Sequence, residues 1–541
     1  MAMTGRMMST PLLISSIIRR AARYSGGVEI VSRGSDGGIH RYTYRECELR
    51  ARKLAQALEA LGLRQGDRIG TLAWNSYRHL ELYYAVPGAG AICHTINPRL
   101  FPEQIVHIVN DAEDTYVCFD VQFLPLVEEI AGRCPGVKAW IMMAGREDMP
   151  TASKVSLLCY EELIGAQDGN YEWPMLDENL ASGLCYTSGT TGNPKGVLYS
   201  HRSTVLHSYA SALPDSLNCS ASEVIMPVVP MFHVNAWELP YSAPLVGAKL
   251  VLPGQRLDGA SLYELIEGEQ VTYSAGVPTV WLGLLEHVRS NDLKFSTFRR
   301  TGIGGSAVSR SMIRAFKELG VDVAHGWGMT ETSAMGASCT LRRQHAGLSE
   351  SEQEKVLEKQ GAVIPGIDMK IVDGLGHELP WDGKTAGDLL VRGPWIIDSY
   401  YGNDTSPLED GWFPTGDVAT IDADGYMHIT DRSKDVVKSG GEWISSIDIE
   451  NIAAAHPAVH LAACIAVRHP KWGERPLLVA VKKAGANVSR GELLQFFEGK
   501  VAKWWVPDDV VFVEAMPMTA TGKFQKAALR EQFKEHRLPT A

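Results

Sequence analysis

Two long stretches of this sequence alternate between helical patterns and short strand-like runs. Between residue 41 and about residue 120, the helical pattern ECELRARKLAQALEALGL is followed by the strand-like runs RIGTLAW and TYVCFD. A second stretch, residues 205–324, contains the strand-then-turn units AKLVLPG, TYSAGVP and RTGIGGSA. Helices that alternate with short strands are typical of a sheet covered by helices, so both stretches predict an α/β fold.

The pattern changes after this alternating part. Residues 340–360 form a charged segment that we expect to be helical and solvated, and residues 369–430 consist of strand-like runs and turns. After DRSKD the chain becomes a compact α+β unit of about 110 residues. A chain of 541 residues is too long for one hydrophobic core. We therefore predict a large N-terminal domain (residues 1–431) of layered α/β sheets with a β-rich subdomain, and a small C-terminal domain (residues 432–541).

Composition narrows the class of protein. The net charge of −11 and the pI of about 5.8 argue against a general nucleic-acid binder, which needs a basic face. Nine cysteines without a CxxC pair favour reduced thiols over a disulfide framework or a zinc site. The apolar run PLLISSII before RRAAR is too short to span a membrane, so we expect a surface-packed amphipathic helix and a cytoplasmic protein.

The segment CYTSGTTGNPKGVLYSH, residues 185–201, differs from its surroundings because it is rich in glycine and hydroxyl side chains. It lacks the GxxxxGK[ST] spacing of a Walker A loop. Glycines nevertheless allow close approach of the backbone to a ligand, while Thr187 and its neighbours can contact phosphate oxygens or Mg²⁺ and Lys195 supplies a cation. Composition alone leaves open a phosphate-binding loop or a flexible surface loop.

Seven motifs in fixed order decide between these alternatives. YTSGTTGNPKGV is followed by PMFHVNAW (230–237), GIGGSA (302–307), GWGMTETS (326–333), GDLLVRGP (387–394), TGDVATIDADGYMHITDRSKDVVKSGGEWIS (415–445) and TATGKFQKAALR (519–530). Together they resemble the adenylate-forming enzymes, which include acyl-CoA synthetases, luciferases and peptide-synthetase adenylation domains. The resemblance covers essentially the whole chain.

This resemblance implies a two-step reaction that uses ATP, CoA and Mg²⁺. A carboxylate attacks the α-phosphate of ATP to give acyl-AMP and pyrophosphate, and a thiol then displaces AMP. Both steps move negative charge among oxygens, so fixed cations and hydrogen-bond donors should matter more than a general base.

The family motifs assign a nucleotide site residue by residue. The resemblance implies that Thr330 contacts the α-phosphate, that Glu331 and Thr187 hold Mg²⁺, and that Asp417 accepts from the ribose hydroxyls. In isolation MTET could be a helix-capping pair, Asp417 a turn residue and Trp327 a core side chain. The full set of implied ATP- and AMP-binding residues is Thr187, Ser188, Gly189, Thr190, Thr191, Lys195, Gly305, Ser306, His325, Gly326, Trp327, Thr330, Asp417, Arg432 and Lys434.

The resemblance also implies a mobile C-terminal domain that swings about a hinge at residues 432–435. Lys523 in TGK resembles the catalytic lysine of adenylation, and the GK spacing favours it over Lys526. After rotation, Lys438 would face the active site. The predicted CoA-contacting residues are Lys438, Gly440, Gly441 and Trp443.

The acyl pocket is predicted from PMFHVNAW and GIGGSA. His233 is expected to border and gate the pocket without transferring protons, and Trp237 and Gly304 to line it. No aspartate is evident on the pocket floor, which favours an apolar acid over an amino acid. The motifs resemble medium- and long-chain fatty-acid–CoA ligases and equally 3-methylmercaptopropionate–CoA ligases. A luciferase-like oxygenase and a non-catalytic nucleotide-binding relative are the further alternatives.

The expected partners follow from this assignment. They are a small carboxylic acid, ATP and CoA, with no nucleic acid, no transmembrane segment and a homodimer as the candidate assembly.

Overall fold

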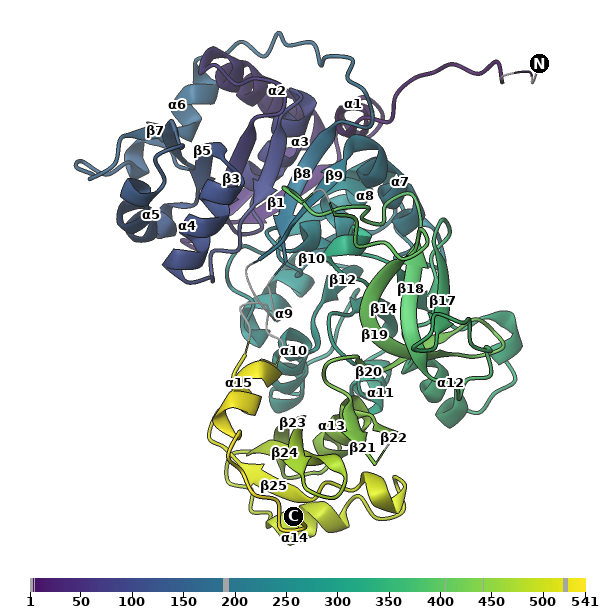
Figure 1. Ribbon diagram of the computed structural model, residues 1–541. Coiled ribbons are helices and arrows are strands. Elements are labelled where there is room, and N and C mark those ends of the chain that lie inside the picture. Colours follow the sequence, from purple (N-terminus) through teal and green to yellow (C-terminus); the bar gives the residue numbers. More distant parts are fainter. Residues whose placement is uncertain (1–2, 4, 188–193, 404, 441, 519–523) are drawn as a thin grey trace.

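A computed structural model describes residues 3, 5–187, 194–403, 405–440, 442–518 and 524–541, with the side chains of residues 442 and 443 left out. It shows a large N-terminal domain of helix-covered sheets and a smaller C-terminal domain at the opposite end from α1 (Figure 1). The predicted α/β fold class is confirmed. The boundary at residue 432 and the mobility of the smaller domain stay predictions.

The first sheet is built from the N-terminal alternating stretch. All its neighbouring strands run parallel except the last pair, β8 and β9, which form a hairpin. Its strand order is β7 (Leu157–Cys159), β6 (Ala139–Met142), β5 (Asp114–Phe119), β3 (Arg68–Leu72), β4 (Ile92–Thr95), β8 (Ala181–Tyr186) and β9 (Gly196–Ser200). Its helices are α2 (Tyr44–Ala60), α3 (Tyr77–Gly88), α4 (Pro102–Asp111), α5 (Leu124–Ile130) and α6 (Tyr160–Gly165).

The second sheet is built mainly from the second alternating stretch, and its central strands are parallel. Its order is β16 (Ala362–Val363), β15 (Ala337–Cys339), β14 (Asp322–Trp327), β13 (Arg300–Ile303), β12 (Tyr273–Gly276), β10 (Val224–Pro227), β11 (Lys249–Leu252), β1 (Glu29–Arg33) and β2 (Ile39–Thr43). Its helices are α7 (His201–Ala212), α8 (Leu239–Val246), α9 (Gly259–Gly268), α10 (Pro278–Ser290), α11 (Arg310–Glu318) and α12 (Glu350–Leu357).

Two smaller sheets complete the molecule. One is antiparallel and is formed mainly by the strand-like runs of residues 369–430. Its order is β17 (Asp368–Val372), β18 (Gly387–Arg392), β19 (Phe413–Ile421) and β20 (Met427–Arg432). The C-terminal sheet contains β22 (Glu442–Ile444), β21 (Val437–Ser439), β24 (Gly473–Lys482), β23 (Val459–His469) and β25 (Asp509–Phe512). Its helices are α13 (Ser446–Ala454), α14 (Arg490–Gln495) and α15 (Lys526–Gln532).

The N-terminal apolar run forms α1 (Ile14–Tyr24), which packs on α2, α3, α7 and α8. Ile14, Ile17 and Ile18 are buried, while the arginines that follow face outward. The predicted surface-packed amphipathic helix is therefore confirmed. In the described part of the chain, no helix is long and apolar enough to cross a membrane.

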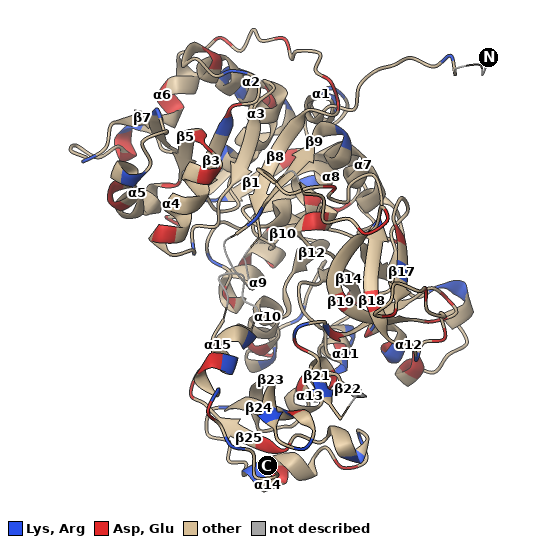
Figure 2. Ribbon diagram, viewed as in Figure 1, with Lys and Arg blue, Asp and Glu red and all other residues tan. Residues whose placement is uncertain are grey.

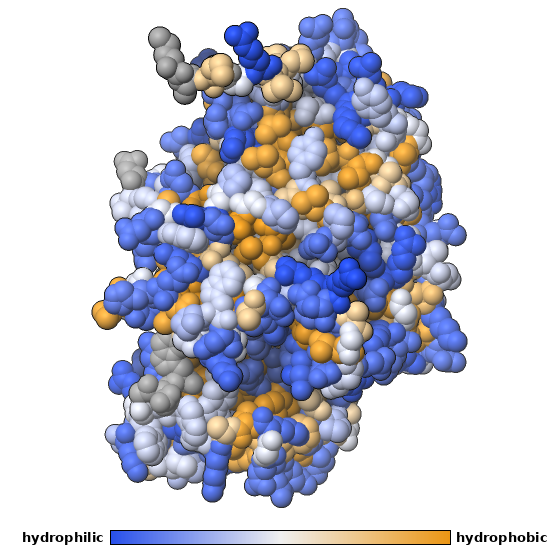
Figure 3. Space-filling view, turned by 90° about the vertical axis from the view of Figure 1, so that its right-hand side faces the viewer, coloured by the Kyte–Doolittle hydropathy of each residue, from blue (hydrophilic) through white to orange (hydrophobic). Residues whose placement is uncertain are grey.

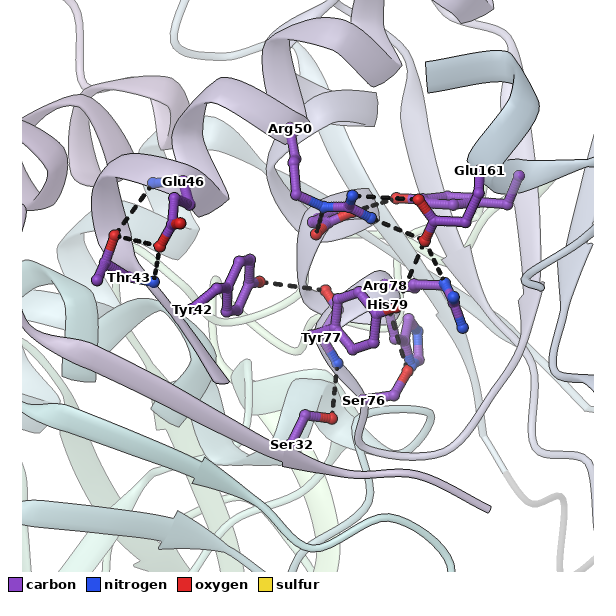
Figure 4. Close-up of polar contacts among 12 residues, drawn as sticks. Ser32, Tyr42, Thr43, Glu46, Arg50, Ser76, Tyr77, Arg78, His79 and Glu161 are labelled. Atoms are coloured by element: carbon purple, nitrogen blue, oxygen red, sulfur yellow. Dashed lines mark hydrogen bonds and ion pairs between the residues drawn. The ribbon is translucent and has the colours of Figure 1, made fainter. Parts of the chain in front are cut away.

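The N-terminal helices are held together by a network of charged side chains (Figure 4). Arg50 on α2 places Nε 2.6 Å from Glu81 Oε1 and Nη2 2.9 Å from Glu161 Oε1. Arg78 on α3 approaches the same Glu161 oxygen at 2.7 Å. Glu81 is fully buried, so the guanidinium of Arg50 offsets a carboxylate that would otherwise be costly inside the protein.

Charged side chains of both signs are interspersed over the outer helices and loops (Figure 2). On the face turned toward the viewer in Figure 3, a recess separates the C-terminal domain from the rest of the molecule. The charged 340–360 segment forms an α-helix only from Glu350 to Leu357, after a short 3₁₀ turn at Arg343–His345. It is not wholly solvated, because Glu354 is buried against Arg314 at 2.6 Å. All nine cysteines are buried free thiols.

Candidate active site

The glycine- and hydroxyl-rich segment connects the two strands of the β8–β9 hairpin. At its base the Thr187 N–H donates to the Lys195 carbonyl at 2.9 Å, and the Lys195 N–H donates to Thr187 Oγ1 at 3.2 Å. The predicted residues Ser188, Gly189, Thr190 and Thr191 lie outside the described residues. The hairpin nevertheless fixes both ends of the loop, and it places a threonine hydroxyl and a lysine side by side at its base.

Tyr400 links the lysine of this loop to the MTET motif. The Lys195 ammonium lies 4.7 Å from the centre of the Tyr400 ring, within cation–π range. The Tyr400 hydroxyl donates to Glu331 Oε1 at 2.8 Å. One aromatic side chain therefore touches both a predicted phosphate ligand and a predicted magnesium ligand.

Glu331 is 7% exposed, in the short helical turn Thr330–Thr332. Burial raises the pKa of its carboxyl. The Tyr400 hydrogen bond and the positive charges of Arg432 and Lys195 act in the opposite direction. The three motifs that contain Glu331, Arg432 and Lys195 are thus close enough in space to interact electrostatically.

The backbone around this turn is supported from two sides. The Tyr199 hydroxyl donates to the Thr330 carbonyl at 2.8 Å, and the Ile397 N–H donates to the Glu331 carbonyl at 2.9 Å. A cavity of about 450 Å³ adjoins the turn and is lined by residues that include Tyr199, Glu331, Trp395 and Tyr400. The MTET turn is therefore positioned by β9 and by the segment that follows β18.

Asp417 connects the second sheet to the antiparallel sheet. It is paired in register with Arg432 across β19 and β20, and Arg432 Nε lies 2.7 Å from its Oδ1. Trp327, at the end of β14, donates its indole N–H to Asp417 Oδ2 at 2.9 Å. The structure thus brings together the predicted ribose ligand, its predicted partner arginine and the predicted adenine-stacking residue.

His325 lies in β14, two residues before Trp327, with its ring 1% exposed. Its Nδ1 lies 2.8 Å from the Glu358 carbonyl oxygen, and its Nε2 lies 3.4 Å from the Gln360 side-chain amide. Burial lowers its pKa to about 4, so the ring is neutral near pH 7. The ring is therefore engaged with segment 358–360, and a contact between His325 and a nucleotide would come from its backbone.

The glycines of GIGGSA allow close packing beside Trp237. A Cβ atom on Gly304 would lie 2.7 Å from the Gly326 carbonyl oxygen and 3.1 Å from the Trp237 ring. Gly305 has a φ of +82°, in the left-handed region that favours glycine. Gly305 and Ser306 are exposed at the end of β13. The predicted acyl-pocket residues Gly304 and Trp237 therefore meet in space.

The turn that carries Trp237 has an unusual backbone. Five consecutive non-glycine residues, Val234 to Glu238, have φ values between 43° and 63°. Each left-handed residue of this kind costs free energy, of order 1–2 kcal/mol. His233, immediately before the turn, is part-exposed, and Trp237 is 8% exposed. Glu238, the residue after Trp237, is fully buried, and the absence of an aspartate from the pocket floor stays a prediction.

In the C-terminal domain, Lys438 is exposed on β21, and its N–H donates to Glu474 Oε2 at 2.8 Å. Gly440 has a φ of +61°, and its N–H donates to the Trp472 carbonyl at 2.8 Å. Gly441, Lys523 and the side chain of Trp443 lie outside the described residues. Among the described residues, the region predicted to contact CoA thus includes a turn at Gly440 that packs on Trp472.

Lys526, which the sequence could confuse with Lys523, has a different environment. Its ammonium lies 2.7 Å from Glu450 Oε1 and donates to Ser446 Oγ at 2.6 Å. The charges of Glu450 and Asp431 raise its pKa despite burial. Lys526 is therefore engaged in holding α15 to α13. At the predicted hinge, Lys434 is exposed, and its carbonyl accepts from Arg530 Nη2 at 3.3 Å.

Sequence inspection missed three of these side chains. Tyr400 lies six residues beyond the GDLLVRGP motif, in the unassigned run WIIDSYYGN. Tyr199 follows the glycine-rich loop, and Glu238 follows PMFHVNAW directly. Tyr400 and Glu238 lie just outside a motif, so extending these motifs by a few residues is the signal that could have found them. Tyr199 lies inside the segment 185–201, where no role was assigned to it.

Comparisons with known proteins show which families and proteins this chain is similar to. The description of the AMP-binding enzyme family matches residues 18–401, and that of the AMP-binding enzyme C-terminal domain matches residues 448–523. A 3-methylmercaptopropionyl-CoA ligase of Ruegeria lacuscaerulensis is 55% identical, covering 98% of this chain and 99% of its own length. A medium-chain-fatty-acid–CoA ligase of Ectopseudomonas oleovorans is 54% identical, covering 98% of both. A long-chain-fatty-acid–CoA ligase of Thermus thermophilus is 47% identical, covering 99% of this chain and 98% of its own.

Solved structures show the same likeness. An anthranilate CoA ligase in complex with anthranoyl-AMP has a TM-score of 0.86 at 25% identity, covering 97% of this chain and 98% of that one. An ATP-bound MatB from Rhodopseudomonas palustris has a TM-score of 0.82 at 25% identity, covering 96% of this chain and 99% of that one.

Proposed function

Because this chain belongs to the AMP-binding enzyme family, we propose that it is an AMP-forming acid–CoA ligase that activates an apolar carboxylic acid. Relatives 54–55% identical over nearly the whole chain carry names of CoA ligases. The observation that carries the proposal within the structure is the contact of Tyr400 with both Lys195 and Glu331. This contact brings together the base of the loop, the MTET turn and the segment after β18.

In the first half-reaction a carboxylate oxygen attacks the α-phosphorus of ATP, and the bond to the β-phosphate oxygen breaks to release pyrophosphate. Lys195 and the Thr187 hydroxyl would bind the phosphates, and Thr330 would donate to the α-phosphate. Asp417 and Arg432 would hold the ribose, and Lys434 would border it. The base would lie between the indole of Trp327 and the exposed backbone at residues 305–306, beside residues 325–326.

Glu331 and Thr187 would contribute a carboxylate and a hydroxyl to a magnesium ion, which are ligand types that Mg²⁺ accepts. Mg²⁺ is usually held by one or two carboxylates together with substrate phosphates. No group of three or more acidic, histidine or cysteine side chains in the described ranges could hold a metal by itself. The donor set available here is one buried carboxylate and one hydroxyl at the base of the loop. The ion would neutralise charge on the phosphates, and the carboxylate would fix its position.

In the second half-reaction the CoA thiol attacks the acyl carbon and AMP leaves. We propose that Lys523 serves the first step and Lys438 the second, after a rotation about residues 432–435 that exchanges the two faces of the C-terminal domain. The ion pair of Lys526 with Glu450 supports the choice of Lys523 as the catalytic lysine, because it holds the Lys526 ammonium in a contact between α15 and α13. The domain boundaries, 1–431 and 432–541, belong to the same proposal.

For the acid we propose a medium- to long-chain fatty acid, with 3-methylmercaptopropionate as the alternative. Both follow from the names of the similar relatives. The buried indole of Trp237 against Gly304 supports a largely apolar wall, with His233 beside it. We further propose a cytoplasmic enzyme that forms a homodimer. The nine buried free thiols support the first, and the second is tested by measuring the oligomeric state.

The test is a screen over saturated acids of increasing length and 3-methylmercaptopropionate, with ATP, CoA and Mg²⁺. Pyrophosphate, AMP and acyl-CoA should form in equal amounts. Pyrophosphate release without a thioester would contradict CoA as the acceptor. Oxygen uptake in the presence of acyl-AMP would favour an oxygenase, and binding of ATP without pyrophosphate release would indicate a non-catalytic relative. Light scattering at known concentration tests the homodimer.

A further inference from the structure

A buried glutamine side chain lies between the second sheet and the antiparallel sheet, near the residues assigned to the nucleotide. Gln360 follows α12 and is 5% exposed. Its Oε1 accepts from the Ile429 N–H at 2.6 Å, and its Nε2 lies 3.4 Å from His325 Nε2. His325 belongs to β14 and Ile429 to β20, so one side chain contacts strands of two different sheets.

The contact with β20 covers the free edge of the antiparallel sheet. β20 is the last strand of that sheet, and an edge strand leaves one row of backbone groups unpaired. The Gln360 N–H donates to the Met427 carbonyl at 3.1 Å, and the Met427 N–H donates to the Gly361 carbonyl at 2.7 Å. Gln360 Oε1 then accepts from Ile429, two residues farther along the strand. The side chain therefore continues a ladder that the backbone of residues 360–361 begins.

The hydrogen bonds on both sides fix the orientation of the amide and the tautomer of the histidine. Because its Oε1 accepts from a backbone N–H, Gln360 turns its amide nitrogen toward His325. The Glu358 carbonyl oxygen, 2.8 Å from His325 Nδ1, can only accept, so Nδ1 carries the proton of the neutral ring. His325 Nε2 then accepts from the Gln360 amide. A continuous chain of hydrogen bonds thus runs from the Glu358 carbonyl through the imidazole and the amide to β20.

The backbone next to Gln360 is closely packed. Gly361 has a φ of +84°, in the left-handed region that favours glycine. A Cβ atom on Gly361 would lie 2.2 Å from the Ser338 carbonyl oxygen of β15. Residues 360–361 are therefore held between β15 and β20, and Gln360 cannot shift without moving one of these strands.

The two strands that Gln360 contacts carry residues assigned to adenosine. Trp327 is the last residue of β14, and Arg432 is the last residue of β20. At the site itself the strands are joined through Asp417, which accepts from the Trp327 indole at 2.9 Å and lies 2.7 Å from Arg432 Nε. Gln360 supplies a second link between the same two strands, away from the assigned ligand residues.

We propose that Gln360 is a positioning residue for the adenosine part of ATP and AMP, because it fixes β20 relative to β14. The inference rests on the nucleotide site of the proposed function and adds a residue that lies outside every family motif. Without this link the ribose ligands on β19 and β20 would shift relative to the indole that faces the base. Hydrogen bonds to ribose hydroxyls depend steeply on distance and angle, whereas stacking on an indole tolerates small shifts. Loss of Gln360 should therefore weaken recognition of the ribose more than recognition of the base.

The experiment measures selectivity for the ribose hydroxyl in Gln360→Met, whose side chain has a similar size but no amide. It compares kcat/KM for ATP with that for 2′-deoxy-ATP by pyrophosphate release, and the Kd of AMP with that of 2′-deoxy-AMP by calorimetry. Both selectivity ratios should fall about 5- to 20-fold, while the KM for CoA changes by less than about twofold. These ratios do not depend on the fraction of active enzyme, so a variant that is only less stable would keep them. The matched control is Gln353→Met on α12, where the amide donates to the Leu348 carbonyl at 3.2 Å, and it should keep both ratios.

His325→Asn tests the other end of the chain of hydrogen bonds. Asparagine can still donate to the Glu358 carbonyl, but it offers no acceptor at the position of Nε2, so its ratios should fall as well. The double variant should lose less than the product of the single losses, since both substitutions break one chain. Wild-type ratios in Gln360→Met would overturn the proposal, as would single losses that multiply or an equal loss in Gln353→Met. If Gln360→Met does not unfold cooperatively, wild-type ratios in His325→Asn would overturn it alone.

The wild-type protein separates this proposal from the proposed function. Equal affinities of wild type for AMP and 2′-deoxy-AMP would overturn the proposal, since there would be no ribose contact to position. If wild type binds AMP selectively but releases no pyrophosphate with any acid, the ligase function fails. The affinity ratio of Gln360→Met then still decides whether Gln360 positions the nucleotide.

Discussion

Removing one hydroxyl group, by Tyr400→Phe, tests whether the contact between the phosphate loop and the MTET turn has a chemical role. The substitution keeps the aromatic ring beneath Lys195 but deletes the donor to Glu331 Oε1, which lies at 2.8 Å. Glu331 is 7% exposed, so water replaces the lost donor poorly. Burial then raises the pKa of the carboxyl with less opposition, and the carboxylate loses its fixed orientation.

The magnitude follows from the kind of hydrogen bond that is lost. A hydrogen bond to a charged group contributes about 1.5–3 kcal/mol, which corresponds to about 10- to 150-fold in rate or binding. We expect this loss in kcat/KM for ATP in the pyrophosphate-release assay. Because the metal would bind through the same carboxylate, a higher concentration of Mg²⁺ should recover part of the loss. Thioester formation from supplied acyl-AMP should change by less than about threefold, since that step no longer involves the β- and γ-phosphates.

The neighbouring tyrosine provides a matched control. Tyr401 carries the same side chain, and its hydroxyl reaches the Ala112 carbonyl only at 3.5 Å, away from Glu331. Tyr401→Phe should therefore leave both half-reactions within about twofold of wild type. The reasoning is refuted if Tyr400→Phe keeps wild-type kcat/KM for ATP. Equal losses in both half-reactions, with no response to Mg²⁺, would instead show that Tyr400 only holds the segment after β18 in place.

Five further substitutions are informative: four test the site, and the fifth, at the buried His207 on α7, tests the stability of the fold. Lys523→Ala should slow acyl-AMP formation about 100- to 1,000-fold and spare thioester formation from supplied acyl-AMP. Lys434→Pro should spare acyl-AMP formation and slow thioester formation, because proline at the hinge blocks the rotation of the C-terminal domain. Equal effects of either variant on both half-reactions would contradict a mechanism with two domain orientations. Trp237→Ala should shift preference toward longer acids by about 50- to 200-fold in kcat/KM across chain lengths, because three or four newly buried methylenes contribute about 0.8 kcal/mol each. An unchanged chain-length profile with changed ATP dependence would indicate that the indole gates a long tunnel, and an unchanged profile with unchanged ATP kinetics would mean that it is only core packing. Trp327→Phe removes the indole donor at 2.9 Å and should raise the KM for ATP about tenfold but not that for CoA, so parallel increases would count against a nucleotide role. Burial lowers the pKa of His207 to about 3, so between about pH 3 and pH 6.5 the imidazole takes up a proton in the unfolded chain but not in the folded one. The free energy of unfolding of wild type, relative to that of His207→Gln, should therefore fall by about 2 kcal/mol from pH 7 to pH 5 in urea unfolding. A difference that stays constant between these pH values would refute this prediction.

Local sequence patterns predicted most of the elements. The helical pattern at 46–63 forms α2, whose start is set by a capping box in which Thr43 Oγ1 accepts from the Glu46 N–H and the Glu46 carboxylate accepts from the Thr43 N–H. The strand-like runs form β3, β5, β11, β12 and β13. These elements were predictable because hydrophobic periodicity and capping depend on residues only a few positions apart.

The motifs determined the family, and with it the list of candidate site residues. A short motif of small, hydroxyl and charged residues indicates its chemistry directly, because the type of each side chain determines what it can bind, whichever distant residues pack around it. The sequence also placed Trp237 beside the predicted acyl site. It did not reveal that Glu238 is buried there, because a glutamate after a motif is exposed in most proteins.

Only the tertiary structure decided which side chains meet. Tyr400 and Glu331 are 69 positions apart, and Trp327 and Asp417 are 90 apart, yet each pair is joined by one hydrogen bond. Such contacts arise where strands and loops from different sheets converge, and no local periodicity encodes them. The burial of Glu238 likewise depends on α7, which packs against the turn that carries it. The sequence by itself determined the chemical groups and the elements that carry them, while packing of distant segments decided which groups are paired or shielded from water.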